Sequence, residues 1–351
     1  MDYQKFINDL IDKLVKEEGS DLHLGAGRIP AFRINGELIF LNGEPLKKED
    51  MLGILKIFLD DNRVESFLKK KEADFSYSFD ENTHLRINAF VERGNICLAI
   101  RLIPKAKSFE DLNLPDILKT FASKRQGFFL VVGPVGQGKS TTLSTMVNII
   151  NNERASHIVT IENPIEFVYK PNKSIIDQRE IGVDSDSFGD ALKAAFREDV
   201  NVILVGEMRD TETISMAVTA AETGHLVLST LHTNNAAQTI DRIIDSFPAN
   251  QQDQIRIQLS SSLIGILSQR LIPRITGGRI PAFELLINNN AIGNLIREKR
   301  THEIATVIET SSEQGMIDMN RYLVELVRKG EITMESAYQY SLNPSALERI
   351  M

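Results

Sequence analysis

The sequence predicts an α/β protein in which a small α+β domain precedes the main sheet and a helical region follows it. Three observations carry this prediction. In the middle of the chain, continuous apolar runs alternate with helical stretches, which is typical of mostly parallel strands buried on both faces. Short alternating strands with a hairpin signal fill the first hundred residues. From about residue 288 onward, apolar residues recur at helical spacing.

The composition indicates a folded, globular chain. It has 351 residues, of which 42% are hydrophobic and 25% charged. This length predicts roughly two to three domains. The proline and charges near Ile103 suit a short connection between domains. The expected division is an N-terminal domain at 1–103, a linker at 104–112, an α/β core at 113–287 and a helical region at 288–351.

The first domain opens with an amphipathic helix over residues 2–18, in which apolar residues recur at helical spacing between charged ones. The Asn35-Gly36 pair is a strong signal for a hairpin turn between two strands. The remaining expected elements are a helix at 47–60 and strands at 73–79, 84–91 and 95–102.

Charge and cysteine content exclude several classes of protein. The net charge of −8 argues against binding of nucleic acid or an anionic membrane along the whole chain, and the basic run Lys69–Lys71 is expected to be a solvated helix end. Cys97 is the sole cysteine, which excludes an internal disulfide or a cysteine zinc cluster and fits a reducing cytoplasm. The sequence shows neither a signal peptide nor a run of ~20 apolar residues, so we expect membrane association only through a partner.

The strongest motif is a phosphate-binding loop. It follows the apolar strand Phe128–Val132 and precedes the helical run Thr141–Ile150. Glycines let successive backbone N–H groups and the helix N-terminus face phosphate oxygens. Lys139 is expected to meet the β- and γ-phosphates, and the Ser140 hydroxyl to contact Mg²⁺. The predicted ATP-binding residues are Gly133, Pro134, Val135, Gly136, Gln137, Gly138, Lys139, Ser140 and Thr141.

Carboxylates follow two other predicted strands. Val202–Val205 leads to Glu207, which we expect to position or deprotonate the attacking water and to reach Mg²⁺ through water. The strand His157–Ile161 leads to Glu162 and Glu166, and from the residues alone either could reach the metal. All three follow the ends of buried strands, where open α/β sheets bind ligands.

Two histidines bracket the strand that begins at Leu226. A zinc site is disfavoured because no third ligand has suitable spacing. His232 follows the C-terminal end of this strand and could sense the γ-phosphate by hydrogen bonding. His225 lies at the other end, where a packing or interface role is expected.

Taken together, these segments resemble the pilus-retraction ATPases of the PilT family, within the wider secretion ATPase superfamily. The resemblance covers nearly the whole chain. The phosphate loop is joined by matches to the family's N-terminal motifs, Asp box, Walker B segment, His box and C-terminal motif, namely Ser20–Leu24, Arg86–Phe90, Arg93-Gly94, Ile161–Phe167, Phe196–Asp210, Thr223–Thr233, Ala291–Glu298 and Thr301-His302.

The resemblance implies a PAS-like N-terminal domain, a RecA-like core and a cytoplasmic homohexamer. Such a ring would bind an inner-membrane pilus platform protein and could meet paralogous pilus ATPases, with no nucleic acid involved. It also assigns roles in the Asp box and His box to Glu166 and His232. Arg86 and Arg101 match N-terminal arginines that face the nucleotide phosphates.

Three positions depart from the family pattern. Asn163 replaces an aspartate, Val200-Asn201 replaces Pro-Asp, and Gly293 replaces an arginine in the motif tied to retraction. The first two leave Glu166 and Glu207 in place, so hydrolysis is expected to survive.

Four functions compete. A helicase is disfavoured by net charge. A pilus-assembly or type II secretion ATPase is disfavoured because those relatives usually carry a four-cysteine zinc insert, which a chain with Cys97 alone lacks. A retraction motor is the main prediction. The alternative is an accessory subunit that binds nucleotide without producing force, and Gly293 is its best support.

Overall fold

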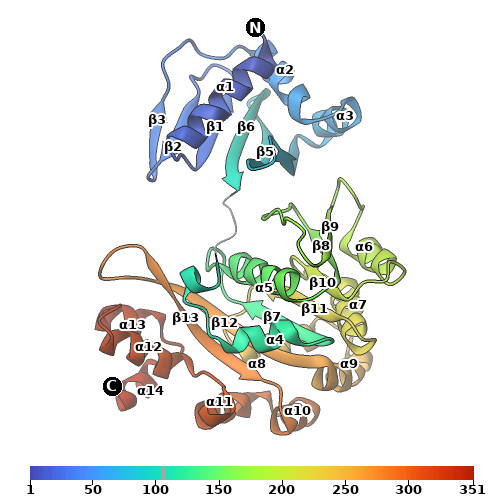
Figure 1. Cartoon of the computed structure of the whole chain (residues 1–351), viewed down its shortest axis with the longest axis vertical. Helices are drawn as coiled ribbons and strands as arrows, with labels where there is room; N and C mark the ends of the chain where they lie inside the picture. Colours follow the sequence, from blue (N-terminus) through green and yellow to red (C-terminus); the bar gives the residue numbers. More distant parts are fainter. Residues whose placement is uncertain (104–107) are drawn as a thin grey trace. The chain divides into compact units, whose positions relative to one another are not determined.

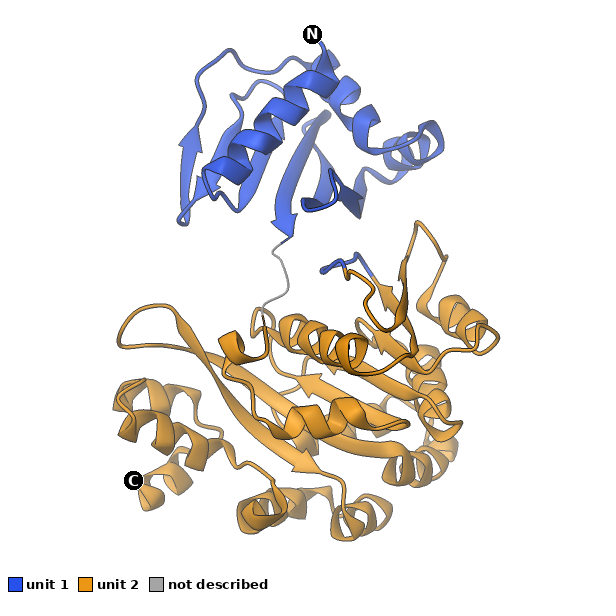
Figure 2. Ribbon diagram, in the orientation of Figure 1, with its two compact units in different colours: residues 1–105, 163–168 blue, residues 106–162, 169–351 orange. Residues whose placement is uncertain are grey.

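The computed structural model describes residues 1–103 and 108–351. The chain divides into two compact units, coloured separately in Figure 2. The first unit comprises residues 1–105 and 163–168, and the second comprises 106–162 and 169–351. The expected linker falls partly on residues 104–107, which lie outside the described residues.

Within the described residues, the first unit is built on a six-stranded antiparallel sheet with the order β3-β2-β1-β6-β5-β4 (Figure 1). Its helices supply the other layer of the core. The elements are α1 (Tyr3–Lys16), β1 (Asp21–Gly25), β2 (Ala31–Ile34), β3 (Glu37–Phe40), α2 (Lys48–Phe58), α3 (Asp61–Lys70), β4 (Glu72–Ser78), β5 (His84–Glu92) and β6 (Asn95–Ile103).

Local sequence signals explain these elements. Asp2 caps α1 by accepting a hydrogen bond from the Lys5 N–H (3.1 Å), and the apolar face of the helix is buried. Asn35 and Gly36 both have positive φ (51° and 88°), as a two-residue hairpin turn requires. The helix α3 was not predicted. Its N-cap, Asp60, is the last residue of the range 47–60 that was expected to form a single helix.

The second unit begins with η1 (Glu110–Leu112) and contains the main sheet. In the described part of this unit, seven strands lie in the order β13-β12-β7-β11-β10-β8-β9, and every neighbouring pair is parallel except β12 and β13. The elements to the end of the sheet are α4 (Ile117–Ser123), β7 (Gly127–Val132), α5 (Lys139–Glu153), β8 (His157–Glu162), β9 (Ile175–Glu180), α6 (Phe188–Ala195), β10 (Val202–Val205), α7 (Thr211–Glu222), β11 (Leu226–Leu231), α8 (Ala236–Asp245), α9 (Ala249–Ser262), β12 (Leu263–Pro273) and β13 (Arg279–Ile287).

The predicted fold class is confirmed, including the mostly parallel sheet. The strand that leads to Glu207 is not the direct neighbour of the strand before the phosphate loop. β11 lies between β7 and β10 and pairs with both. All residues of β7, β10 and β11 are buried, which explains why their sequences are almost entirely apolar.

Helices complete the chain. Apolar residues of the first ones, including Ile292 and Ile304, join the hydrophobic core of the main sheet. Those of the last ones pack with Ile272 and Ile280 of the β12–β13 hairpin. The elements are α10 (Asn290–Arg297), η2 (Thr301–Glu303), α11 (Ile304–Thr310), η3 (Ser312–Gln314), α12 (Met319–Arg328), α13 (Met334–Tyr340) and α14 (Pro344–Ile350).

None of the helices in residues 1–103 and 108–351 has the length and hydropathy needed to cross a lipid bilayer.

Candidate active site

The phosphate loop joins β7 to the N-terminus of α5. All three of its glycines, Gly133, Gly136 and Gly138, have positive φ, which would strain other residues. Gly138, with φ 78°, lies immediately before the helix, and Gly133 has φ 148°. A Cβ atom at Gly133 would lie only 2.5 Å from the Gln269 carbonyl oxygen. The loop therefore packs closely against β12 and leads directly into the N-terminus of α5. A glycine-rich loop at a helix N-terminus is an arrangement that binds phosphate.

Lys139 is buried at the start of α5. Its ammonium group donates hydrogen bonds to the carbonyl oxygens of Gly133 (2.8 Å) and Pro134 (2.9 Å). It also lies 3.3 Å from Nδ1 of His232. The positive charge is thus held within the curve of the loop.

His232 follows β11, the strand inserted between β7 and β10. The insertion of β11 explains the position of His232. Its ring lies between Lys139, which follows β7 and the phosphate loop, and Glu207, which follows β10. Nδ1 faces Lys139, and Nε2 lies 4.0 Å from a carboxylate oxygen of Glu207. The structure therefore brings together three predicted site residues, Lys139, His232 and Glu207.

The electrostatics of His232 favour its neutral form. Burial lowers the pKa of His232 below its ordinary value, and the positive charges of Lys139 and Arg209 lower it further, against an opposing effect of Glu207. A neutral imidazole carries one hydrogen-bond donor and one acceptor. His232 is thus suited to hydrogen bonding beside the phosphate loop.

Glu207 follows β10, and its side chain is only 17% exposed. Its carboxylate pairs with Arg209 at 2.7 Å, whereas the Arg209 side chain is largely exposed. The strand end is fixed by a hydrogen bond from the Thr230 hydroxyl to the Gly206 carbonyl (2.7 Å). A carboxylate on a rigid strand end, within reach of the loop that binds phosphate, is suited to orienting water.

The two carboxylates after β8 have different surroundings. Glu162 is buried and accepts a hydrogen bond from the Thr160 hydroxyl (2.7 Å). Its backbone lies beside Gly206, where a Cβ atom would be 3.4 Å from the Glu162 Cα. Glu166 belongs to the segment 163–168, which groups with the first unit, and it accepts a hydrogen bond from Arg86 (3.5 Å).

The two predicted arginines lie in the first unit and face each other across β5 and β6. Each has an acidic partner. Arg86 donates to both carboxylate oxygens of Asp74 (2.7 and 3.3 Å), and Arg101 donates to Asp21 (2.7 Å). Like charges at directly opposed positions of a sheet destabilise it. The acidic partners offset that repulsion.

The donor set beside the phosphate loop fits Mg²⁺ of the kind bound with a nucleotide. Such magnesium keeps several waters and takes one or two protein oxygens plus substrate phosphates. Ser140 at the start of α5 and Glu207 at the strand end offer a hydroxyl and a carboxylate. Among the described residues, no three His, Cys, Asp or Glu side chains gather into a metal site, and such a magnesium needs none.

His225 has the packing role that its position indicated. Its Nδ1 lies 3.0 Å from the Ala220 carbonyl oxygen, and its ring packs edge-on against Phe196 with centroids 5.7 Å apart.

Two polar residues of β12 that lie beside the phosphate loop were not predicted to belong to the site. Gln269 donates to the Gln137 carbonyl (2.7 Å), and Arg270 donates to Asn234 beyond His232 (2.9 Å). A signal was present in the sequence. Ser268, Gln269 and Arg270 interrupt an apolar strand, and polar side chains persist in a buried strand only where partners satisfy them.

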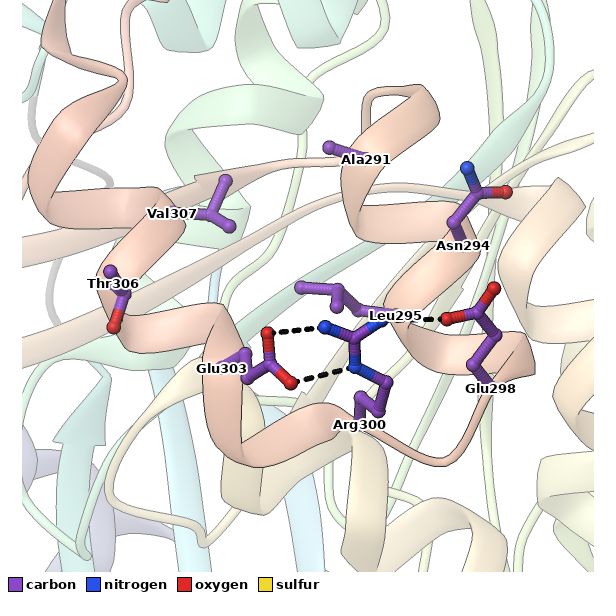
Figure 3. Close-up of a pocket in the computed structure, with 8 residues that line it drawn as sticks. All are labelled: Ala291, Asn294, Leu295, Glu298, Arg300, Glu303, Thr306 and Val307. Carbon is purple, nitrogen blue, oxygen red and sulfur yellow. Dashed lines mark hydrogen bonds and ion pairs between the residues drawn. The ribbon is translucent and has the colours of Figure 1, made fainter.

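A separate pocket of about 390 Å³ lies at the C-terminal motif (Figure 3). Arg300 is held there by Glu298 (2.9 Å) and by Glu303 (2.6 and 2.8 Å), so its charge is already neutralised. The other lining residues are Ala291, Asn294, Leu295, Thr306 and Val307. Gly293 is buried on α10 and is not among them.

A phosphate loop after a central strand, an inserted strand followed by His232, and a half-buried carboxylate after the next strand define a P-loop ATPase. The chain belongs to the family described as Type II/IV secretion system proteins, whose profile matches residues 2–338. It is an ATP-hydrolysing, PilT-like member of that family.

Three comparisons place the chain within the family. It is 42% identical to the "type IV pilus retractation ATPase PilT" of Pseudomonas aeruginosa over 96% of this chain and 98% of that protein. It is 43% identical to the "uncharacterized protein YggR" of Escherichia coli over 93% and 99% of the two chains. A crystal structure of the pilus retraction motor PilT with bound ADP superposes with a TM-score of 0.90, at 45% identity over 97% and 98% of the two chains.

Proposed function

We propose that this chain is a magnesium-dependent ATPase that drives retraction of a type IV pilus as a ring-shaped motor at the cytoplasmic side of the pilus machine. One observation carries the proposal: Lys139, His232 and Glu207 come together at the phosphate loop of a chain that matches pilus-retraction ATPases along nearly its full length.

Each residue has a part in ATP + H₂O → ADP + phosphate. Lys139 and the backbone N–H groups of the loop bind the phosphates. Glu207 orients the attacking water, and His232 hydrogen-bonds near the γ-phosphate. Ser140 and Glu207 would hold Mg²⁺, which offsets the negative charge that develops on the phosphoryl oxygens. Glu166 is proposed as a second carboxylate of the site.

Arg86 and Arg101 are proposed to complete this site in a homohexamer. The transition state spreads negative charge over the transferred phosphoryl group, and an added arginine is commonly worth ~10³–10⁵ in rate. In the site on the core unit, Lys139 is a cation that hydrogen-bonds within the loop. Arginines from a neighbouring subunit would add positive charge and would link hydrolysis to domain movement. Such a ring would act on an inner-membrane pilus platform protein.

The accessory role is the second candidate. Gly293 in the C-terminal motif favours it, since the chain lacks the arginine expected there.

A gene deletion tests the proposal. Cells that lack this chain should carry excess pili and lose surface motility. The wild-type gene should restore both traits, whereas Glu207→Gln, produced at the same level, should restore neither. Normal pilus number and motility after deletion would contradict a retraction function.

A further inference from the structure

Three consecutive residues of β12 place polar side chains inside the core unit. Ser268, Gln269 and Arg270 are all buried, with exposed fractions of 0%, 3% and 6%. Burying a polar group is costly unless it is hydrogen-bonded, and burying a charge is costlier still. Their contacts therefore indicate what this part of the strand is built to hold.

Gln269 fixes the phosphate loop to β12. Its amide donates to the Gln137 carbonyl (2.7 Å) and accepts from the Thr142 hydroxyl on α5 (2.7 Å). The Gln137 side chain in turn accepts a hydrogen bond from the Leu271 N–H (2.6 Å). Two hydrogen bonds, one from the Gln269 side chain and one to the Gln137 side chain, thus fix the phosphate loop to β12 at Gln137.

Arg270 extends this support to the segment after His232. Its guanidinium donates to the Gln269 carbonyl (3.0 Å), the Asn234 carbonyl (2.9 Å) and the Asn234 side-chain oxygen (3.1 Å). One nitrogen also lies 3.2 Å from the position that a Cβ atom would take at Gly133. The guanidinium therefore fills the space between the start of the phosphate loop and Asn234.

The charge of Arg270 has an unusual environment. Within the described residues, no carboxylate lies within ion-pair distance of it, and its hydrogen bonds go to neutral oxygens. Burial lowers its pKa, although an arginine remains protonated in proteins. The nearby carboxylate Glu284 instead accepts from the Ala236 N–H (2.8 Å) and from Ser268 (3.1 Å), so it anchors the start of α8.

We propose that Arg270 is a positioning residue of the ATPase site, which acts through Asn234 to hold His232 against the phosphate loop. The inference rests on the role proposed for His232. Asn234 is two residues beyond His232, and its backbone and side-chain oxygens are held by the same guanidinium nitrogen. The segment that contains His232 is therefore fixed on both sides, by the buried strand β11 before it and by the hydrogen bonds of Arg270 to Asn234 after it.

A change at Arg270 should therefore alter turnover more than nucleotide binding. The phosphates are bound by Lys139 and the loop, and Gln269 keeps the loop in place without Arg270. Nδ1 of His232 lies 3.3 Å from the Lys139 ammonium nitrogen, and this distance should become more variable in the Arg270 variant. Lysine keeps the charge but cannot reproduce the fork of donors, so Arg270→Lys is a specific change.

The test is a double-mutant cycle between Arg270→Lys and His232→Ala, read out as kcat for phosphate release and as affinity for an ATP analogue. Arg270→Lys alone should lower kcat about tenfold and change affinity less than about twofold. In the His232→Ala background, the same change should lower kcat less than about twofold. Asn234→Ala, at an exposed position, should lower kcat in the same direction.

Arg274→Lys is the matched control. Arg274 lies just beyond the same strand. Among the described residues it pairs with Glu331 and not with the phosphate loop or the His232 segment, so its variant should keep the wild-type kcat. Equal losses of kcat from Arg270→Lys in both backgrounds would overturn the inference, as would a loss of affinity that matches the loss of kcat. If Arg270→Lys unfolds, an unchanged kcat in Asn234→Ala overturns it. A wild-type chain that hydrolyses no ATP would instead contradict the proposed function.

Discussion

Lys139 and Glu207 have separable roles at the residue scale. Lys139 faces the loop interior, so Lys139→Ala should weaken nucleotide binding by removing a charge that neutralises phosphate. Glu207→Gln keeps the shape of the side chain and should retain binding, while turnover falls by at least about 100-fold. Nucleotide titration and steady-state phosphate release measure the two effects. Normal turnover by Glu207→Gln would remove Glu207 from the mechanism.

The carboxylates after β8 allow a direct comparison. We expect Glu166→Gln to lower turnover, and Asn163→Asp to change it little because the working carboxylate lies elsewhere. Glu162→Gln is the informative third variant, since Glu162 is buried beside Gly206. A loss confined to Glu162→Gln would transfer the role from Glu166. A rise on the order of 100-fold in Asn163→Asp, about 2.7 kcal/mol of barrier, would mark the native site as degenerate and favour the accessory role.

His232 gives the site a predicted pH dependence. Its pKa lies below the ordinary value of 6.5, because burial and the charge of Lys139 disfavour protonation. Below pH 6.5, the unfolded chain therefore takes up more protons at this residue than the folded chain does. The stability contribution is fully present above pH 6.5 and is lost as the pH falls through the lowered pKa.

Activity should follow the same direction. The acid limb of kcat/KM that depends on His232 should lie below pH 6.5, and His232→Gln should remove it. The matched control is His225→Gln, which alters a histidine that packs against Phe196 and should leave the limb unchanged. A limb centred at or above pH 7 that disappears in His232→Gln would contradict a neutral imidazole.

At the scale of elements, the sequence predicts those parts whose signals are local. The apolar strands, the Asn35-Gly36 turn and the phosphate loop are each specified by residues that are consecutive in the sequence. The order of the strands cannot be predicted in this way, because the insertion of β11 between β7 and β10 depends on pairing between distant segments. The contacts of Gln269 and Arg270 were missed for the same reason. They join residues more than a hundred positions apart, or connect β12 with the segment after β11.

The helix α10 carries a further prediction. Gly293 lies in its interior, and a Cβ atom there would meet Arg297 and the Ser260 carbonyl at an ordinary 3.4 Å. Gly293→Ala should therefore stabilise the core unit by about 0.5–1 kcal/mol, since glycine is a poor helix former. Denaturant unfolding monitored in the core measures this change. A loss of stability would show that the position needs glycine for close packing.

Gly53 on α2 provides the contrasting helix glycine. A Cβ atom there would lie 2.2 Å from the ring of Tyr3, so Gly53→Ala should destabilise the first unit, by about 1–3 kcal/mol. Opposite signs for the two variants would establish that local space, and not helix propensity alone, decides the outcome.

At the scale of the whole molecule, the proposal requires an assembly in which subunits share active sites. Arg86→Ala or Arg101→Ala should depress turnover far more than nucleotide binding, with the fold intact. Titrating the double variant into wild-type protein should lower activity more steeply than dilution, because each site depends on a neighbour. A strictly linear decline, together with a monomeric mass in ATP, would overturn both the ring and the shared site.

Retraction of single pili tests the central claim most directly. The measurement follows labelled pili in cells whose sole retraction ATPase is this chain, with Glu207→Gln as the matched inactive control. The account predicts that pili shorten in the first strain and stay extended in the second. If pili fail to shorten although the purified chain hydrolyses ATP, this chain is an accessory subunit and the proposed motor function is wrong.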